Sequence, residues 1–171
     1  MKITALLAGL VALSCSGAAS AAEVFAGLHA HGVKTPLSLN SDREGGADVS
    51  IGIRGDGIAG TRLQPYGFGQ LNTNGGTNFL VAGLSARFGN RVYVRPAVGF
   101  AIHDGSASKV DLPDRLAFGA RVLFAPELAI GTQVTERIGV EASWTHFSHA
   151  QLAGKQNPGV DNIGVRLNLR L

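Results

Sequence analysis

The stretch DNIGVRLNLRL, residues 161–171, decides the fold class because its apolar and polar side chains alternate. From Ile163 onwards an apolar residue stands at every second position, and Arg166 and Arg170 fall between them. Successive side chains of a β-strand point to opposite faces, so the pattern predicts a strand with one apolar and one polar face. We therefore expect the chain to end in an amphipathic strand rather than in a helix.

The same alternation recurs along the whole chain upstream of this stretch. We expect eight strands, at residues 23–33, 46–54, 62–72, 78–88, 91–103, 115–134, 136–148 and 161–171. An even number of strands of about ten residues is typical of outer-membrane barrels. The sequence thus predicts an all-β fold, an eight-stranded antiparallel transmembrane β-barrel of the outer membrane.

Charge and hydropathy indicate which face of each strand meets lipid. Of the 171 residues 45% are hydrophobic and 16% are charged, yet no apolar run beyond residue 22 is long enough for a membrane helix. The charged residues share the polar faces of the predicted strands: Asp48, Arg54, Arg87, Arg91, Arg95, Arg121, Glu141, Arg166 and Arg170. With Gly, Ala and Ser beside them, these faces suit a narrow polar lumen. A soluble, lipocalin-like barrel is the alternative.

Two further patterns concern the ends of the strands. Pro65, Pro96 and Pro126 fall at apparent lipid-facing positions, where we expect bulges or strand ends because proline cannot donate to a ladder. Long and short connections alternate along the chain, as surface loops and periplasmic turns do. This alternation predicts a periplasmic N-terminus for the mature chain.

The N-terminus has the pattern of a signal peptide. Lys2 precedes an apolar stretch at residues 3–13, and small residues follow it. We expect cleavage at Ala21 or Ala22, so that residues 1–22 are a signal peptide and 23–171 a single β-barrel domain. Cys15, the one cysteine of the chain, would leave with the signal peptide.

Three polar residues interrupt the lipid-facing series near one end of the predicted barrel. His146 and Ser148 continue the apolar face of one strand, and Asp161 opens the next strand. A hydroxyl, an imidazole and a carboxylate are the parts of a serine-hydrolase triad. The alternative is that the three are ordinary polar residues at the boundary with the lipid headgroups.

These residues also carry a family resemblance. The segments HFSHAQL (146–152) and QNPGVD (156–161), followed by an alternating strand, resemble the PagL lipid A 3-O-deacylases. The resemblance implies Ser148 as nucleophile, His146 as general base and acid, and Asp161 as the orienting acid, where the family often has Glu. The implied reaction is hydrolysis of the ester-linked 3-hydroxyacyl chain of lipid A, with no cofactor and no metal ion.

The sequence departs from the family pattern in the loop after Ser148. His149 stands where the family commonly has Asn, and Gln151 where it commonly has Gly. Those positions are associated with stabilising the oxyanion of the reaction. Asn157, or backbone N–H groups of residues 149–152, could take over that role here.

The expected partner is lipopolysaccharide in the outer leaflet. Basic residues in or beside the surface loops would suit its phosphates: Arg43, Lys109, Arg115 and Lys155. A formal net charge of +3 is too small to indicate nucleic acid. The sequence leaves a homodimer open, and also the alternative function of a non-catalytic eight-stranded barrel with a structural or adhesive role.

Overall fold

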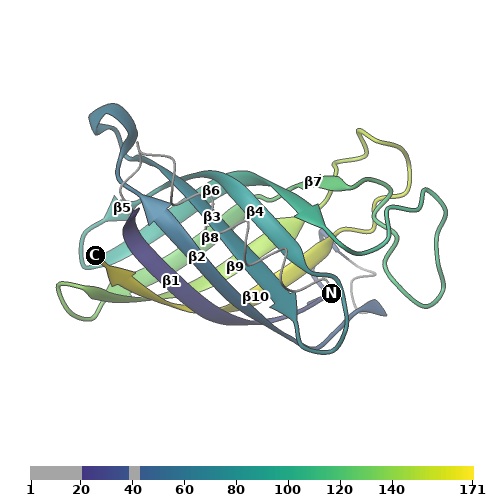
Figure 1. Ribbon diagram of the computed structural model, residues 1–171, viewed down its shortest axis with the longest axis horizontal. Helices are drawn as coiled ribbons and strands as arrows, with labels where there is room; N and C mark the ends of the chain where they lie inside the picture. Colours follow the sequence, from purple (N-terminus) through teal and green to yellow (C-terminus); the bar gives the residue numbers. More distant parts are fainter. Residues whose placement is uncertain (1–20, 39–42) are drawn as a thin grey trace.

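The computed structural model describes residues 21–38 and 43–171, which form a closed β-barrel (Figure 1). Residues 1–20, most of the predicted signal peptide, lie outside this range. The signal peptide and the division into a leader and a single domain therefore remain predictions.

Ten strand segments make up the described barrel. They are β1 (Ala21–Ala30), β2 (Ala47–Gly55), β3 (Leu63–Asn72), β4 (Phe79–Ala86), β5 (Phe88–Gly89), β6 (Val92–His103), β7 (Val122–Phe124), β8 (Glu127–Gln133), β9 (Ile138–Phe147) and β10 (Val160–Arg170), with a 3₁₀ turn η2 (Ile58–Gly60). Every pairing between these strands is antiparallel, and β1 pairs with β10 on one side and β2 on the other. Segments β4 and β5 form one barrel strand, and β7 and β8 form another, so the described chain closes as eight strands.

The barrel wall is apolar outside and its lumen is polar. Large apolar side chains of the strands are exposed on the outer surface, as along β10 at Ile163, Val165, Leu167 and Leu169. The largest fully buried side chains include three arginines. Arg95 forms an ion pair with Glu141, with Nε 2.9 Å from Oε1, and Arg166 Nη2 donates to Glu127 at 2.6 Å. Charges inside and apolar groups outside confirm the membrane barrel, and the soluble alternative is wrong.

Apolar residues also fill the lumen near the end that carries the long loops. Phe79 stacks on Phe147 with ring centroids 4.0 Å apart, and Phe118 meets Phe79 edge-on. Leu116 and Ala117 are fully buried beside them. This aromatic cluster closes that mouth of the barrel.

The prolines mark gaps in the ladders. Pro126 separates β7 from β8. Pro96 pairs with Leu128 of β8, and on its other side it lies between the β4 and β5 pairings. Pro65 stands just past the last residue that pairs with β2. Pro126 thus lies between two strand segments, as the sequence predicted, whereas Pro65 and Pro96 lie inside β3 and β6, each beside a gap in one neighbouring ladder.

Two predicted strand ends are wrong. The sixth strand was expected from residue 115, but β7 begins at Val122, because Leu116 and Phe118 turn into the mouth of the barrel. The first strand was expected to reach residue 33, but β1 ends at Ala30. Gly32 then takes φ +68°, a conformation that breaks a strand and suits glycine.

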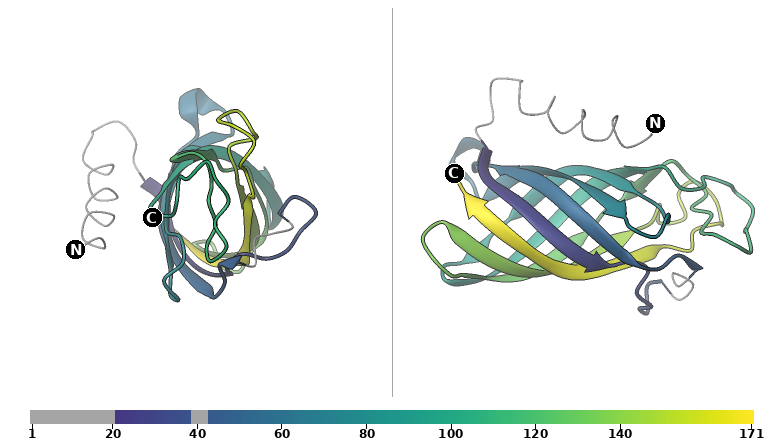
Figure 2. Two further views of the ribbon diagram at one scale, coloured as in Figure 1. Left: turned by 90° about the vertical axis from the view of Figure 1, so that its right-hand side faces the viewer. Right: turned by 60° about the horizontal axis from the view of Figure 1, so that its bottom comes forward.

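Long connections gather at one end of the barrel, and the C-terminus lies at the other (Figure 2). The long connections are residues 31–46, 104–121 and 148–159, whereas residues 134–137 make a short turn beside the C-terminus. In the part of the chain that is described, no helix is long and apolar enough to cross a membrane.

Candidate active site

Strand register brings the three candidate residues together at the loop end of the wall. His146 of β9 pairs directly with Asp161 of β10. Ser148 follows β9 and forms a bridge with Phe124, whose N–H donates to the Ser148 carbonyl at 2.7 Å. The nucleophile candidate thus has a fixed backbone although it lies outside the strand.

The side chains form a continuous hydrogen-bonded series. Nδ1 of His146 lies 2.9 Å from Oδ1 of Asp161, and Nε2 lies 3.0 Å from Oγ of Ser148. A carboxylate can only accept, so Nδ1 carries the proton and Nε2 is left to accept the Ser148 hydroxyl. This is the tautomer that a general base needs.

Asp161 is the most deeply buried of the three side chains. Asp161 is completely buried, the side chain of His146 is 12% exposed and Ser148 is 8% exposed. The carboxylate is therefore shielded from water, whereas His146 and Ser148 both keep some exposed surface. A substrate can reach the imidazole and the hydroxyl but not the carboxylate.

Two donors to Asp161 carry no signal in the sequence. Trp144 Nε1 donates to Asp161 Oδ1 at 2.8 Å, and Thr35 Oγ1 donates to Oδ2. Ser38 Oγ also lies 3.3 Å from His146 Nδ1. Thr35 and Ser38 are more than a hundred residues from the triad candidates in the chain, and closure of the barrel between β1 and β10 brings them together.

Gly159 makes room for the imidazole. It adopts φ +65°, and a Cβ there would stand 3.0 Å from His146 Cε1 and 2.9 Å from Ser38 Oγ. Both the backbone conformation and the space favour glycine.

The loop after Ser148 is held by His149. Its Nδ1 accepts from the Ala153 N–H at 3.2 Å, so its Nε2 carries the proton and donates to the Gln156 carbonyl at 2.7 Å. The backbone N–H of His149 donates to Asn157 Oδ1 at 3.0 Å. The side chain of Asn157 therefore lies beside the nucleophile candidate, with its Oδ1 bound to the backbone of the next residue.

The predicted basic rim is partly paired with carboxylates. Arg43 binds Asp111 at 2.5 and 3.1 Å, and Arg115 binds Asp114 at 2.9 Å. These guanidinium groups hold the pKa values of both aspartates below their usual range. Lys109 and Lys155 are exposed.

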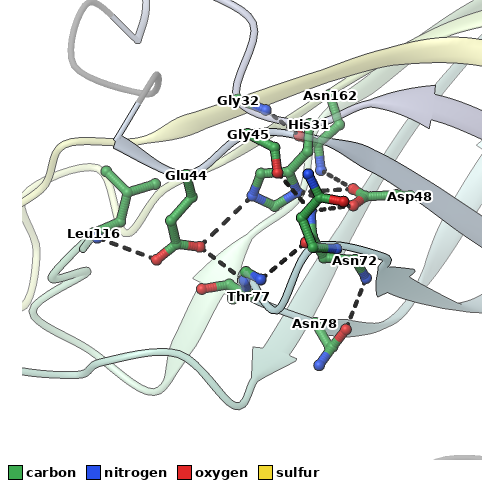
Figure 3. Close-up of polar contacts among 12 residues, drawn as sticks. His31, Gly32, Glu44, Gly45, Asp48, Asn72, Thr77, Asn78, Leu116 and Asn162 are labelled. Atoms are coloured by element: carbon green, nitrogen blue, oxygen red, sulfur yellow. Dashed lines mark hydrogen bonds and ion pairs between the residues drawn. The ribbon is translucent and has the colours of Figure 1, made fainter. Parts of the chain in front are cut away.

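A second polar cluster lies in the barrel mouth, where Figure 3 shows His31 between Asp48 and Glu44. His31 Nδ1 lies 2.8 Å from Asp48 Oδ2, and Nε2 lies 3.7 Å from Glu44 Oε2. Burial opposes the charged imidazole, but the two carboxylates outweigh it and raise the pKa of His31 to about 9.

Glu44 in turn joins the surface loops. Its carboxylate accepts the N–H of Thr77 at 2.8 Å and of Leu116 at 3.1 Å. Burial opposes its charge, yet His31 and these amides lower its pKa to about 2. Through Glu44, the ion pair with His31 thus connects the segment after β1 to the loops that contain Thr77 and Leu116.

Comparisons with solved structures place the fold among small outer-membrane barrels. A crystal structure of the outer membrane enzyme PagL aligns with a TM-score of 0.62 and 16% identity, over 88% of this chain and 100% of that one. Neisserial surface protein A aligns with a TM-score of 0.59 and 12% identity, over 90% and 99%. A designed transmembrane β-barrel aligns with a TM-score of 0.51 and 7% identity, over 89% and 98%.

These likenesses concern the fold, because a designed barrel shares it. No curated protein matches the sequence. The profile of the family described as lipid A 3-O-deacylase (PagL) matches residues 27–170, which include β9, β10 and the loop between them. A match over nearly the whole barrel means that this outer-membrane protein belongs to the PagL family of lipid A 3-O-deacylases.

Proposed function

We propose that the protein is a serine esterase that hydrolyses the ester-linked 3-hydroxyacyl chain at the 3-position of lipid A. Ser148 is the nucleophile, His146 the general base and acid, and Asp161 the orienting acid. The observation that carries this proposal is the hydrogen-bonded series from Ser148 Oγ through His146 to Asp161 on the outer wall of the barrel.

The reaction uses each group in turn. His146 Nε2 takes the hydroxyl proton as Ser148 Oγ attacks the ester carbonyl, and the resulting imidazolium is stabilised by Asp161. The imidazolium then protonates the departing sugar oxygen, which leaves an acyl group on Ser148. A water molecule, deprotonated by His146, releases the 3-hydroxy fatty acid and restores the hydroxyl of Ser148.

The oxyanion needs donors close to Ser148. The Asn157 amide is adjacent, since its Oδ1 accepts the N–H of His149, and Nδ2 is the donor group of the same side chain. Asn157 is therefore our candidate for oxyanion stabilisation.

The position of Ser148 fits a lipid substrate. Long loops of outer-membrane barrels face the cell exterior, so the loop end with Ser148 lies at the outer leaflet. An acyl chain on the barrel wall would meet apolar side chains below the triad, such as Ile163 and Val165. The exposed Lys109 and Lys155 suit the phosphates of lipid A.

Mass spectrometry of lipid A from cells that express the wild-type protein or Ser148→Ala tests the proposal. We expect the wild type alone to remove one 3-hydroxyacyl group. The Ala variant removes only one hydroxyl group and should fold normally, which the mobility of the unheated barrel on SDS gels checks.

Ser143→Ala is the matched control, because Ser143 lies in the lumen on β9, the strand that Ser148 follows, and contacts His29. It should deacylate lipid A like the wild type. If lipid A is identical in cells with wild type and Ser148→Ala, the esterase proposal is wrong. A structural or adhesive role of the barrel is then the better interpretation.

A further inference from the structure

We propose that residues 33–38, called here the Thr35 arm, position the orienting acid, with Thr35 as a positioning residue for Asp161. This inference rests on the proposed function and adds a residue to the same site. The Thr35 hydroxyl fixes one oxygen of the Asp161 carboxylate while Trp144 and His146 hold the other.

The Asp161 carboxylate has a donor on each oxygen. Oδ1 accepts from Trp144 Nε1 and from His146 Nδ1, whereas the hydroxyl of Thr35 is the donor to Oδ2. Because the carboxylate is fully buried, water cannot replace a lost donor. Without the Thr35 hydroxyl, Oδ2 loses this donor and the carboxylate is held through Oδ1 alone, so its orientation toward His146 is less tightly fixed.

The direction of the Thr35 proton is set by the arm itself. The N–H of Leu37 donates to Thr35 Oγ1 at 3.1 Å, and the N–H of Ser38 donates to the Thr35 carbonyl at 3.1 Å. With one lone pair of Oγ1 occupied by Leu37, the hydroxyl proton points to Asp161.

The arm is anchored to the strand that carries Asp161. The N–H of Val33 donates to the Asp161 carbonyl at 2.8 Å, and the N–H of Gly32 donates to Asn162 Oδ1 at 3.0 Å. Asn162 Nδ2 donates in turn to Asp48 Oδ2 at 3.1 Å. Figure 3 shows this contact beside the His31 ring. The base of the arm and the orienting acid therefore share one rigid support across β1, β2 and β10.

Trp144 supplies the second constraint from the lipid-facing wall. It pairs with Leu128 of β8 and Ile163 of β10, so its indole is held by strand register rather than by the arm. Because Trp144 also packs on the wall where substrate would lie, its substitution has two effects. Substitution of Thr35 instead tests the positioning of Asp161 without changing the surface that would bind substrate.

The test compares Thr35→Val with Thr35→Ser in the full-length protein, folded in detergent micelles with purified lipid A as substrate. Valine keeps the shape and removes the donor, whereas serine keeps the donor. We expect Thr35→Val to lower kcat about 10- to 100-fold, the cost of a lost hydrogen bond to a charged group. KM should stay unchanged, and Thr35→Ser should restore most of kcat.

Thr73→Val is the matched control, because Thr73 is also a surface-loop threonine but binds the Ala47 carbonyl, away from the triad. It should leave kcat and KM as in the wild type. An equal loss of kcat in Thr73→Val and Thr35→Val, or a wild-type kcat in Thr35→Val, would overturn the proposal.

A measurement without substrate separates this inference from the proposed function. Titration of ¹³C-labelled aspartate by NMR follows the pH at which Asp161 takes up a proton. That pH should rise in Thr35→Val, because the ionised form loses a donor, and return to the wild-type value in Thr35→Ser. An unchanged titration in Thr35→Val refutes the positioning role even where wild-type activity is present. A higher titration pH of Asp161 in Thr35→Val supports the positioning role of Thr35 even if lipid A is not the substrate.

Discussion

At the scale of single residues, Gln151 occupies a backbone conformation that suits glycine. Its φ is +60°, in the left-handed region, and its side chain is exposed. Such a conformation costs an ordinary residue about 1–2 kcal/mol. This backbone conformation would suit the glycine that the family resemblance implies at this position.

Gln151→Gly should consequently raise the free energy of unfolding by up to about 1 kcal/mol, since relief of strain exceeds the added entropy of the unfolded chain. Turnover should stay within about twofold of the wild type. Urea unfolding in micelles and lipid A deacylation measure the two quantities. Gly159→Ala is the contrasting variant, because Gly159 has φ +65° and lies against His146. It should lower both the free energy of unfolding and the turnover.

At the scale of elements, the segment 104–121 acts as a cap on the barrel mouth rather than as the start of a strand. Phe118 is fully buried and packs on Phe79 and His103, with ring centroids 6.1 and 4.6 Å away. Phe79 stacks on Phe147, which lies between His146 and Ser148 in the chain. The cap thus supports the backbone of the site from the lumen.

Phe118→Ala should lower the free energy of unfolding by about 3–5 kcal/mol, the usual cost of a cavity where a buried phenylalanine stood. It should also slow the labelling of Ser148 by a fluorophosphonate. Val110→Ala, at an exposed position of the same segment, is the control and should change neither. Equal stability of the two variants would show that the cap does not stabilise the barrel.

At the scale of the whole molecule, the cluster of His31 and Glu44 couples the surface loops to pH. The pKa of His31 is raised from 6.5 to about 9, so its contribution to stability is complete below about pH 6.5 and is lost as the pH rises through 9. The pKa of Glu44 is lowered from 4.5 to about 2, so its contribution is complete above pH 4.5 and is lost as the pH falls through 2.

Protection of the Thr77 and Leu116 amides, which donate to Glu44, should therefore be greatest between about pH 4.5 and 6.5. Hydrogen exchange, corrected for the intrinsic rate at each pH, measures this protection. Glu44→Gln should reduce it and flatten its dependence on pH. A wild-type profile in Glu44→Gln would rule out the cluster as the cause.

The sequence by itself determined the barrel and the candidates for its chemistry. Alternation with a period of two is a local property of each strand, so eight strands and their lipid-facing sides could be predicted without knowing which strands are neighbours. His146, Ser148 and Asp161 were found because each interrupts an apolar series along its own strand. The alternation misled at residues 115–121, where apolar side chains turn into the mouth of the barrel, and at residues 31–33, beyond the end of β1.

Only the tertiary structure decided what surrounds those candidates. Closure of the barrel pairs β1 with β10 and so brings Thr35 and Ser38 against Asp161 and His146, which no local pattern indicates. The donors that Trp144 and Thr35 supply to Asp161, and the space at Gly159, depend on how separate segments of the chain pack together. Periodicity records the environment of each side chain along one strand, whereas a catalytic arrangement depends on distances between strands, and these are fixed when the barrel closes.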